Sequence, residues 1–305
     1  MNVRRIDAEA AGRFLVGIYG ANVEMEEPIA QGEWSRAFAF RLGDRHLIAR
    51  FNPEREAFDL DVFAERFRSA TIPIPAIVTV GEGPDGYFAV SERAFGDFLE
   101  ELDAERFRAV RPALVRLLEA LRSADTAGTN GFGPWDAATG DGRYPRWRDY
   151  LLDVEAEVPG RSVDSWRDKL RQSPLAADAF DRGMDALHEL APACPELRSV
   201  VHSDLLNRNV LVQGGAITAV IDWQCAMYGD HLYDLAWFGF WAPWHAGVSG
   251  AGLGALATEA DARLRMRCYE VHIGVRHLIY NAWRRGVGAD LDAVARRTLE
   301  VFRQS

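Results

Sequence analysis

Residues 201–212 have the sequence VHSDLLNRNVLV, in which a polar loop leads into a short apolar strand. The loop holds the pattern His-x-Asp-x4-Asn, which begins at His202, passes through Asp204 and ends at Asn209. With the residue frequencies of this chain, such a pattern arises by chance with a probability of about 1%. The pattern therefore marks this loop as the candidate functional centre of the protein.

A second apolar run follows the loop and ends at Asp222. The residues between the two runs, QGGA at 213–216, are typical of the tight turn of a β-hairpin. Folding at this turn pairs Val212 with Ile217 and brings Asn209 and Asp222 to the same end of the hairpin. We therefore predict that these two side chains and the aspartate of the preceding loop converge.

The three converging side chains have the composition of a phosphoryl-transfer site. An amide oxygen and a carboxylate suit Mg²⁺, which prefers oxygen ligands, so Asn209 and Asp222 are the predicted metal ligands. Asp204 is the predicted catalytic base, because a separate carboxylate can accept the proton of an attacking hydroxyl. Protein kinases divide these tasks in the same way. The alternative is a hairpin whose end is polar without any catalytic role.

Composition limits the class of protein and of partner. The 305 residues are 48% hydrophobic and 26% charged, as in soluble globular proteins, and no apolar run approaches a membrane span. The N-terminal residues lack a signal-peptide core, and three widely spaced cysteines predict free thiols. A net charge of −10 argues against nucleic acid and suits a polycationic small molecule. We expect a cytoplasmic monomer that binds neither nucleic acid nor membrane.

The N-terminal third predicts a nucleotide-binding sheet. Residues 31–40, QGEWSRAFAF, place a Gly- and Ser-containing loop before a strand, and residues 46–51 form the returning strand. Backbone N–H groups of such a loop can cover phosphates, and Ser35 is the candidate side chain. By itself this pattern also fits an ordinary hairpin.

Arg50 ends the second of these strands, where a kinase places the lysine that holds the α- and β-phosphates. Arginine can bind phosphate with two hydrogen bonds and keeps its charge. A helix is predicted over residues 53–68, and on it Asp61 is the acid expected to orient Arg50, with Glu65 as the substitute. A solvated helix face is an equal alternative for both acids.

Strands at 77–80 and 87–90 complete the predicted sheet, and the strand pattern ends at residues 91–96. We interpret this segment as a hinge whose backbone groups around Ser91 and Arg93 bind adenine. The predicted fold is α+β and two-lobed like a protein kinase. Its small antiparallel-sheet lobe spans residues 1–94 and its larger, mainly helical lobe spans 95–305.

The second lobe is predicted to consist of helices around the catalytic hairpin. Residues 130–144 are rich in Gly and Asp and predict a loop. Trp241 and Trp244 flank Pro243, a context in which exposed rings could stack on a sugar. Aromatic residues at helical spacing just before them more often belong to a core. Helices are predicted at 103–123 with a break or kink at Pro112, at 147–152, at 174–190, at 259–285 and at 291–302.

The order of these motifs resembles the aminoglycoside phosphotransferase family, and within it the hygromycin B phosphotransferases. The likeness runs over nearly the whole chain. The segments that carry it are residues 32–38 (GEWSRAF), 72–75 (IPIP), 131–134 (GFGP), 147–149 (WRD), 217–223 (ITAVIDW), 226–230 (AMYGD) and 241–244 (WAPW).

This resemblance implies a kinase that transfers a phosphoryl group from ATP or GTP, with Mg²⁺, to a hydroxyl of an aminoglycoside such as hygromycin B. It implies Asp204 as base, Asn209 and Asp222 as metal ligands, and Trp241 and Trp244 at the antibiotic site. Asp234 is expected to be structural, and Arg208 adds a charge where the hygromycin enzymes have an amide.

Acidic residues should bind the ammonium groups of such an acceptor, and Asp230, Glu259 and Glu270 are the candidates. One rival interpretation is a kinase of the same fold that acts on a metabolic alcohol such as choline, homoserine or an amino sugar. Another is a non-catalytic binding module, which the complete set of Asp204, Asn209 and Asp222 disfavours.

Overall fold

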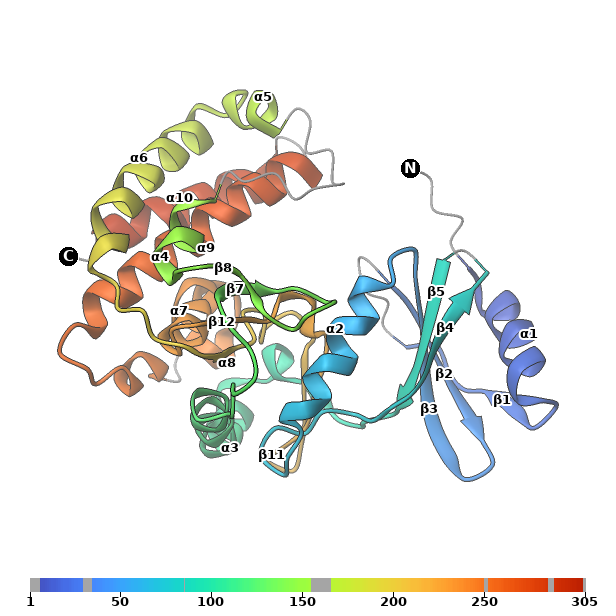
Figure 1. Cartoon of the computed structure of the whole chain (residues 1–305). Coiled ribbons are helices and arrows are strands. Elements are labelled where there is room, and N and C mark those ends of the chain that lie inside the picture. The colour runs from blue at the N-terminus through green and yellow to red at the C-terminus, as the bar shows by residue number, and fades with distance from the viewer. Residues whose placement is uncertain are drawn as a thin grey trace.

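The chain folds into a small part built on an antiparallel sheet and a larger, mainly helical part, as the computed structural model in Figure 1 shows. This arrangement confirms the predicted fold class. The structure describes residues 6–29, 35–84, 86–154, 166–249, 252–284 and 288–303. None of the helices within these ranges is long and apolar enough to cross a membrane.

The small part is a five-stranded antiparallel sheet in the order β1-β2-β3-β5-β4. Helix α1 (Ala8–Tyr19) begins where the Asp7 carboxylate accepts the Ala10 N–H at 2.8 Å. The helix packs its buried Leu15 against the apolar face of the sheet. The strands are β1 (Val23–Met25), β2 (Arg36–Leu42), β3 (Arg45–Asn52), β4 (Ile77–Gly83) and β5 (Gly86–Glu92).

Helix α2 (Glu56–Ala64) and the 3₁₀ turn η1 (Glu65–Phe67) lie between the sheet and the helical part (Figure 1). Phe63 of this helix packs edge-on against Trp135 of the larger part, with ring centroids 5.2 Å apart. On another face, Asp61 is buried toward the segment that follows the catalytic hairpin. The helix thus joins both parts near the predicted site.

The hairpin that the sequence predicts after the His-x-Asp-x4-Asn loop belongs to a three-stranded sheet in the order β11-β10-β6. Strands β10 (Val210–Gln213) and β11 (Ala216–Val220) are antiparallel and pair Val212 with Ile217, as the sequence predicts. Gly214 and Gly215 both have positive φ, which the turn requires. Strand β6 (Asp97–Phe98) follows the hinge and pairs with β10.

The prediction of a loop at residues 130–144 is wrong. The segment contains β7 (Phe132–Trp135) and β8 (Gly142–Tyr144), which join a four-stranded sheet in the order β8-β7-β12-β9. The other strands are β9 (Ser199–Val201) and β12 (Met227–Gly229). Gly142 lies against the Phe132 backbone, where a Cβ atom would meet it at 2.4 Å. The glycines that suggest a loop therefore allow close strand approach.

The helical part encloses the second core of the protein, and its predicted helices are present. Of the break or kink predicted at Pro112, the break is absent, because helix α3 continues through this residue. Helix α7 is apolar on nearly all sides and buried, which marks it as a central helix. The helices are α3 (Ala104–Arg122), α4 (Trp147–Leu152), α5 (Trp166–Arg171), α6 (Pro174–Leu190), α7 (Leu232–Trp241), α8 (Ala246–Ser249), α9 (Ala262–Arg284) and α10 (Ala289–Arg303).

Candidate active site

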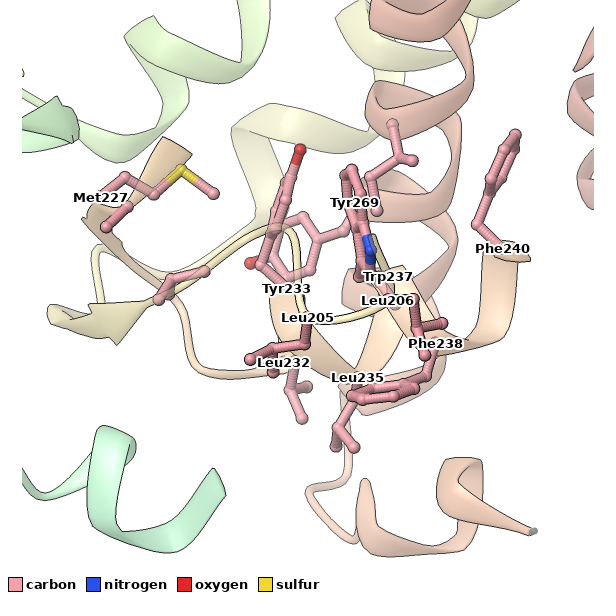
Figure 2. Packing of buried hydrophobic residues seen from close by; sticks show 14 of the residues in the cluster. Leu205, Leu206, Met227, Leu232, Tyr233, Leu235, Trp237, Phe238, Phe240 and Tyr269 are labelled. Atoms are coloured by element: carbon pink, nitrogen blue, oxygen red, sulfur yellow. The ribbon is translucent and has the colours of Figure 1, made fainter. Parts of the chain in front are cut away.

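The loop at residues 202–209 is fixed in place by the first turn of the central helix α7. The Asp234 carboxylate accepts the backbone N–H groups of His202 at 3.0 Å and Ser203 at 2.8 Å. Figure 2 shows the side chains of Leu205 and Leu206 inserted into the apolar cluster around α7. Asp234 therefore has the structural role that the family resemblance implies, and the loop is held on both its polar and its apolar side.

The end of the hairpin brings the predicted residues together. The Ile221 N–H donates to the Asn209 carbonyl at 2.9 Å, which sets Asn209 beside Asp222. The Asn209 amide nitrogen donates to the Asp204 carbonyl at 2.8 Å and to the Asp204 carboxylate at 3.1 Å. The convergence that the turn predicts is confirmed.

Backbone strain is concentrated at this site. Among the described residues, the only non-glycine residues with positive φ are Ser203, Arg208 and Asp222, at 59°, 61° and 62°. This conformation costs about 1–2 kcal/mol for an ordinary residue, so surrounding contacts must enforce it. Ser203 is held by its hydroxyl, which donates to the Cys225 carbonyl at 2.6 Å.

Both carboxylates of the site ionise with difficulty. Burial raises the pKa of Asp204 well above its usual range, and the nearby charge of Asp222 adds to this, while hydrogen bonds from Asn207 and Asn209 oppose it. Burial also raises the pKa of Asp222 to about 6, with a contribution from Asp61. Such shifts are typical of catalytic carboxylates and of sites that bind cations.

The residues present fit a hydrated Mg²⁺. The Oδ1 atom of Asp222 is buried and has no hydrogen-bond partner within the described part of the chain. Because the Asn209 nitrogen donates to Asp204, the amide oxygen is the atom left for a cation. Within the same ranges no cluster of three or more His, Cys, Asp or Glu side chains could hold a metal ion. A cation here would depend on Asp222, Asn209, water and phosphate oxygens, as Mg²⁺ commonly does.

Arg50 meets the predicted acid. Its guanidinium forms an ion pair with the Asp61 carboxylate, and both side chains are largely buried. The second oxygen of Asp61 accepts the Trp223 N–H at 2.9 Å, directly after Asp222. The pairing of Arg50 with Asp61 is confirmed, whereas Glu65 binds Arg68 and the Ile77 N–H instead. Asp61 thus links the sheet strand β3 to the end of the hairpin that holds Asp222.

The remaining residues predicted to contact the nucleotide, Ser35, Ser91 and Arg93, lie in or next to the five-stranded sheet. The Ser35 hydroxyl accepts the Asn52 amide at 3.1 Å, while most of the predicted phosphate loop, at 30–34, lies outside the described residues. Ser91 pairs with both neighbouring strands. The hinge interpretation requires a free Arg93 N–H, but this group donates to the His46 carbonyl at 3.0 Å. Arg93 also lines a cavity of about 360 Å³ that neither Asp204 nor Asp222 borders.

The prediction that Asp230 contacts the substrate is wrong. Its carboxylate is completely buried and accepts two hydrogen bonds from Arg265, at 2.7 Å each, and one from the Tyr269 hydroxyl at 2.5 Å. It also accepts the Leu232 N–H at 3.0 Å, at the start of α7. No lone pair is left for a substrate, so the residue anchors α7 instead.

Glu270 lies in α9, opposite Gly239 of α7, where a Cβ atom would meet its carboxylate at 2.4 Å. Burial raises its pKa to about 7, although Arg297 at 3.8 Å lowers it. The other acidic candidate, Glu259, pairs with His231 and Arg122. Glu270 is therefore buried near Arg297, and Glu259 is already paired with His231 and Arg122.

Trp241 and Trp244 lie together at the end of α7, with ring centroids 5.2 Å apart, and Trp244 is 43% exposed. Trp241 is the last residue of α7, about 10 Å along the helix from Asp234. The cluster also includes Trp237 and His277, whose rings lie 5.2 Å apart. Sequence reasoning did not connect His277 to this cluster, because the contact joins α7 to α9; the spacing of Trp237 and Trp241 was the available signal.

Comparisons with known proteins agree with this geometry. The sequence model of the family described as phosphotransferase enzyme family matches residues 26–269. The chain is 32% identical over 282 residues to hygromycin-B 4-O-kinase of Escherichia coli, covering 91% of this chain and 80% of that protein.

Two crystal structures resemble the whole chain. Aminoglycoside phosphotransferase APH(4)-Ia matches with a TM-score of 0.86 and 31% identity, over 97% of this chain and 99% of that one. A thermostable mutant of the same enzyme, in ternary complex with AMP-PNP and hygromycin B, matches with a TM-score of 0.83 and 30% identity. That match covers 96% of this chain and 98% of the mutant.

Proposed function

Because the chain belongs to the phosphotransferase enzyme family, we propose that it transfers the γ-phosphoryl group of ATP to a hydroxyl of an aminoglycoside, with hygromycin B as the acceptor. The observation that carries this proposal is the convergence of Asp204, Asn209 and Asp222 at the end of one hairpin. The 32% identity to a hygromycin-B kinase supports the choice of acceptor.

In this mechanism the acceptor oxygen forms a bond to the γ-phosphorus while the bond to the bridging oxygen of ADP breaks. Asp204 accepts the hydroxyl proton, and its raised pKa makes it a better base than an ordinary carboxylate. Asn209 and Asp222 would hold Mg²⁺, which neutralises phosphate charge when bound. Positioning and charge compensation provide most of the acceleration, because this reaction needs little covalent help.

The nucleotide is proposed to lie between the sheet and the hairpin. Arg50, held by Asp61, binds the α- and β-phosphates, and Ser35 lies on the side of the phosphate loop. The Arg93 carbonyl is the hinge group proposed to meet adenine or guanine, because Ser91 pairs with both neighbouring strands and the Arg93 N–H donates to the His46 carbonyl. We place the boundary of the two lobes at residues 94 and 95, where the five-stranded sheet has ended.

The charge of Arg208 is compatible with a cationic acceptor. Its guanidinium lies 3.1 Å from the Glu101 carboxylate and 5.6 Å from the centroid of the Phe98 ring. The pairing reduces the net charge that an approaching ammonium group would meet. Trp241 and Trp244 would supply the apolar surface for the acceptor, as exposed aromatic rings do for sugars.

The test is a substrate panel with the purified chain. We expect ADP release and a phosphorylated product, detected by mass spectrometry, with hygromycin B and ATP, and loss of both when EDTA removes Mg²⁺. Choline, homoserine and amino sugars serve as the rival acceptors, and GTP as the rival donor. Turnover of one of these alcohols without turnover of any aminoglycoside would contradict the proposed acceptor.

We also propose that the enzyme acts as a monomer in the cytoplasm, where ATP and Mg²⁺ are available. Light scattering coupled to size-exclusion chromatography should give the mass of one chain. A stable mass of two chains would contradict the monomer.

A further inference from the structure

The segment that follows the hinge runs directly beside the catalytic loop. Strand β6 pairs antiparallel with β10, with Phe98 opposite Leu211. The chain leaves this strand after Phe98, and Glu100, two residues on, contacts Arg208, the residue before Asn209. The 3₁₀ turn η2 (Leu99–Glu101) therefore faces the end of the loop that carries the proposed metal ligand.

Two acids of this turn hold Arg208 by different atoms. The Glu100 carboxylate accepts the backbone N–H of Arg208, and the Glu101 carboxylate accepts its guanidinium at 3.1 Å. Glu101 and the Arg208 side chain are about half exposed, so their ion pair adds little. The bond from Glu100 is the more consequential one, because it acts on the backbone at the residue before Asn209.

Stability does not explain Glu100. Its Oε2 atom is buried and unpartnered among the residues with described structure, and burial raises its pKa. Its charge also opposes the ionisation of Asp204. An unpaired buried carboxylate oxygen is unfavourable for folding. Glu100 therefore lowers the stability of its surroundings, although its other oxygen binds the loop.

We propose that Glu100 is a positioning residue, which holds Arg208 in its left-handed conformation and thereby fixes Asn209 as a cation ligand. The φ of Arg208 is 61°, a conformation that a residue with a side chain adopts only when neighbouring contacts enforce it. The hydrogen bond that the Arg208 N–H donates to the Glu100 carboxylate is such a contact. This inference rests on the proposed function, because it assumes that a cation–nucleotide complex binds here.

The experiment measures the affinity of a fluorescent ATP analogue with and without Mg²⁺. We expect Glu100→Ala to weaken Mg²⁺-dependent binding about 10-fold, the range seen when groups supporting metal ligands are removed, while Mg²⁺-free affinity stays within about 2-fold. Glu100→Gln keeps an oxygen acceptor and should recover most of the loss. The exposed Glu105→Ala, at the start of α3, is the matched control.

A rescue variant separates positioning from a general loss of structure. Glycine adopts positive φ without steric cost, so Arg208→Gly combined with Glu100→Ala should restore the Mg²⁺ dependence. Thermal unfolding of each variant checks that it folds. If the double variant stays as impaired as Glu100→Ala, or if Glu100→Gln is equally impaired, the proposal is wrong.

Nucleotide binding by the wild-type chain shows whether the role of Glu100 or the proposed function itself is wrong. Mg²⁺-dependent binding in the wild type together with unchanged binding in Glu100→Ala overturns the role of Glu100 alone. A wild type whose nucleotide binding ignores Mg²⁺ overturns the proposed function and this inference with it.

Discussion

Two groups of acids lie close together in the sequence and differ sharply in their surroundings. Asp204 and Asp222 have raised pKa values, and Asp222 has a buried oxygen without a partner in the described structure. Asp230, only eight residues after Asp222, has both oxygens hydrogen-bonded to Arg265 and further bonds from Tyr269 and Leu232.

The difference separates acids that stabilise this fold from acids that could bind a ligand. A buried carboxylate whose bonds are complete stabilises the packing around it and has nothing left for a ligand. A buried carboxylate whose bonds are incomplete is unfavourable until a cation or a reacting proton arrives. The first description fits Asp230, and the second fits Asp222, whose Oδ1 atom is buried without a partner in the described part of the chain, while Asp204 shares the raised pKa.

The largest expected effect tests the incomplete group. Asp204→Asn should lower kcat by roughly 10²–10⁴-fold, because the substitution removes the base. Its melting temperature should equal or exceed that of the wild type, since burial disfavours the charge that is removed. Steady-state kinetics and thermal unfolding check both results, and retained turnover would refute the assignment.

The complete group should give the opposite result. Asp230→Ala leaves the Arg265 guanidinium buried without its bidentate partner and should lower the free energy of unfolding by about 3–5 kcal/mol in urea titrations. Asp261→Ala is the matched control, because Asp261 binds the same arginine from an exposed position and should cost less than about 1 kcal/mol. Equal costs for the two variants would contradict the contrast.

The carboxylate of Glu270 lies between these two cases, and the effect of its replacement on stability should depend on pH. Its folded pKa of about 7 exceeds its usual value of 4.5, so the stability of the wild type is complete below pH 4.5 and falls as pH rises to 7. Glu270→Gln has no charge to bury, and should be more stable than the wild type by up to about 3 kcal/mol above pH 7.

This advantage should vanish near pH 4.5. Unfolding measured between pH 4 and 8 tests the prediction. Glu300→Gln, which alters an exposed partner of the same Arg297, should show no such pH dependence. A constant difference between Glu270→Gln and the wild type across this range would contradict the assignment.

The smallest effect concerns Asp61, which binds both Arg50 and the backbone N–H directly after Asp222. Asp61→Asn can keep the bond from the Trp223 N–H but loses the ion pair with Arg50, and should raise KM for ATP about 10-fold. Asp59→Asn, which breaks an exposed pair with Arg55 on the same helix, is the control. An unchanged KM would show that Arg50 does not depend on Asp61 for its position.

Much of the site could be predicted because its parts are local in sequence. The turn at Gly214-Gly215 and the alternation of the flanking strands are short-range signals, and they suffice to place Asn209 beside Asp222. For Arg50 the sequence named Asp61 as the partner, with Glu65 as the substitute and a solvated helix face as an equal alternative, and the structure shows the pair with Asp61. The interpretation of residues 130–144 failed because glycines that permit close strand contact also occur in loops.

Local patterns of the sequence predicted the two-part fold and the convergence of Asp204, Asn209 and Asp222, because hydrophobic periodicity and turn chemistry act between near neighbours. Which acids are available to a ligand depends instead on packing between distant parts of the chain. Asp230 is removed from the candidate substrate contacts by Arg265 and Tyr269, which lie on a distant helix. The bonding state of a buried carboxylate depends on residues far away in the chain, and no local pattern records it.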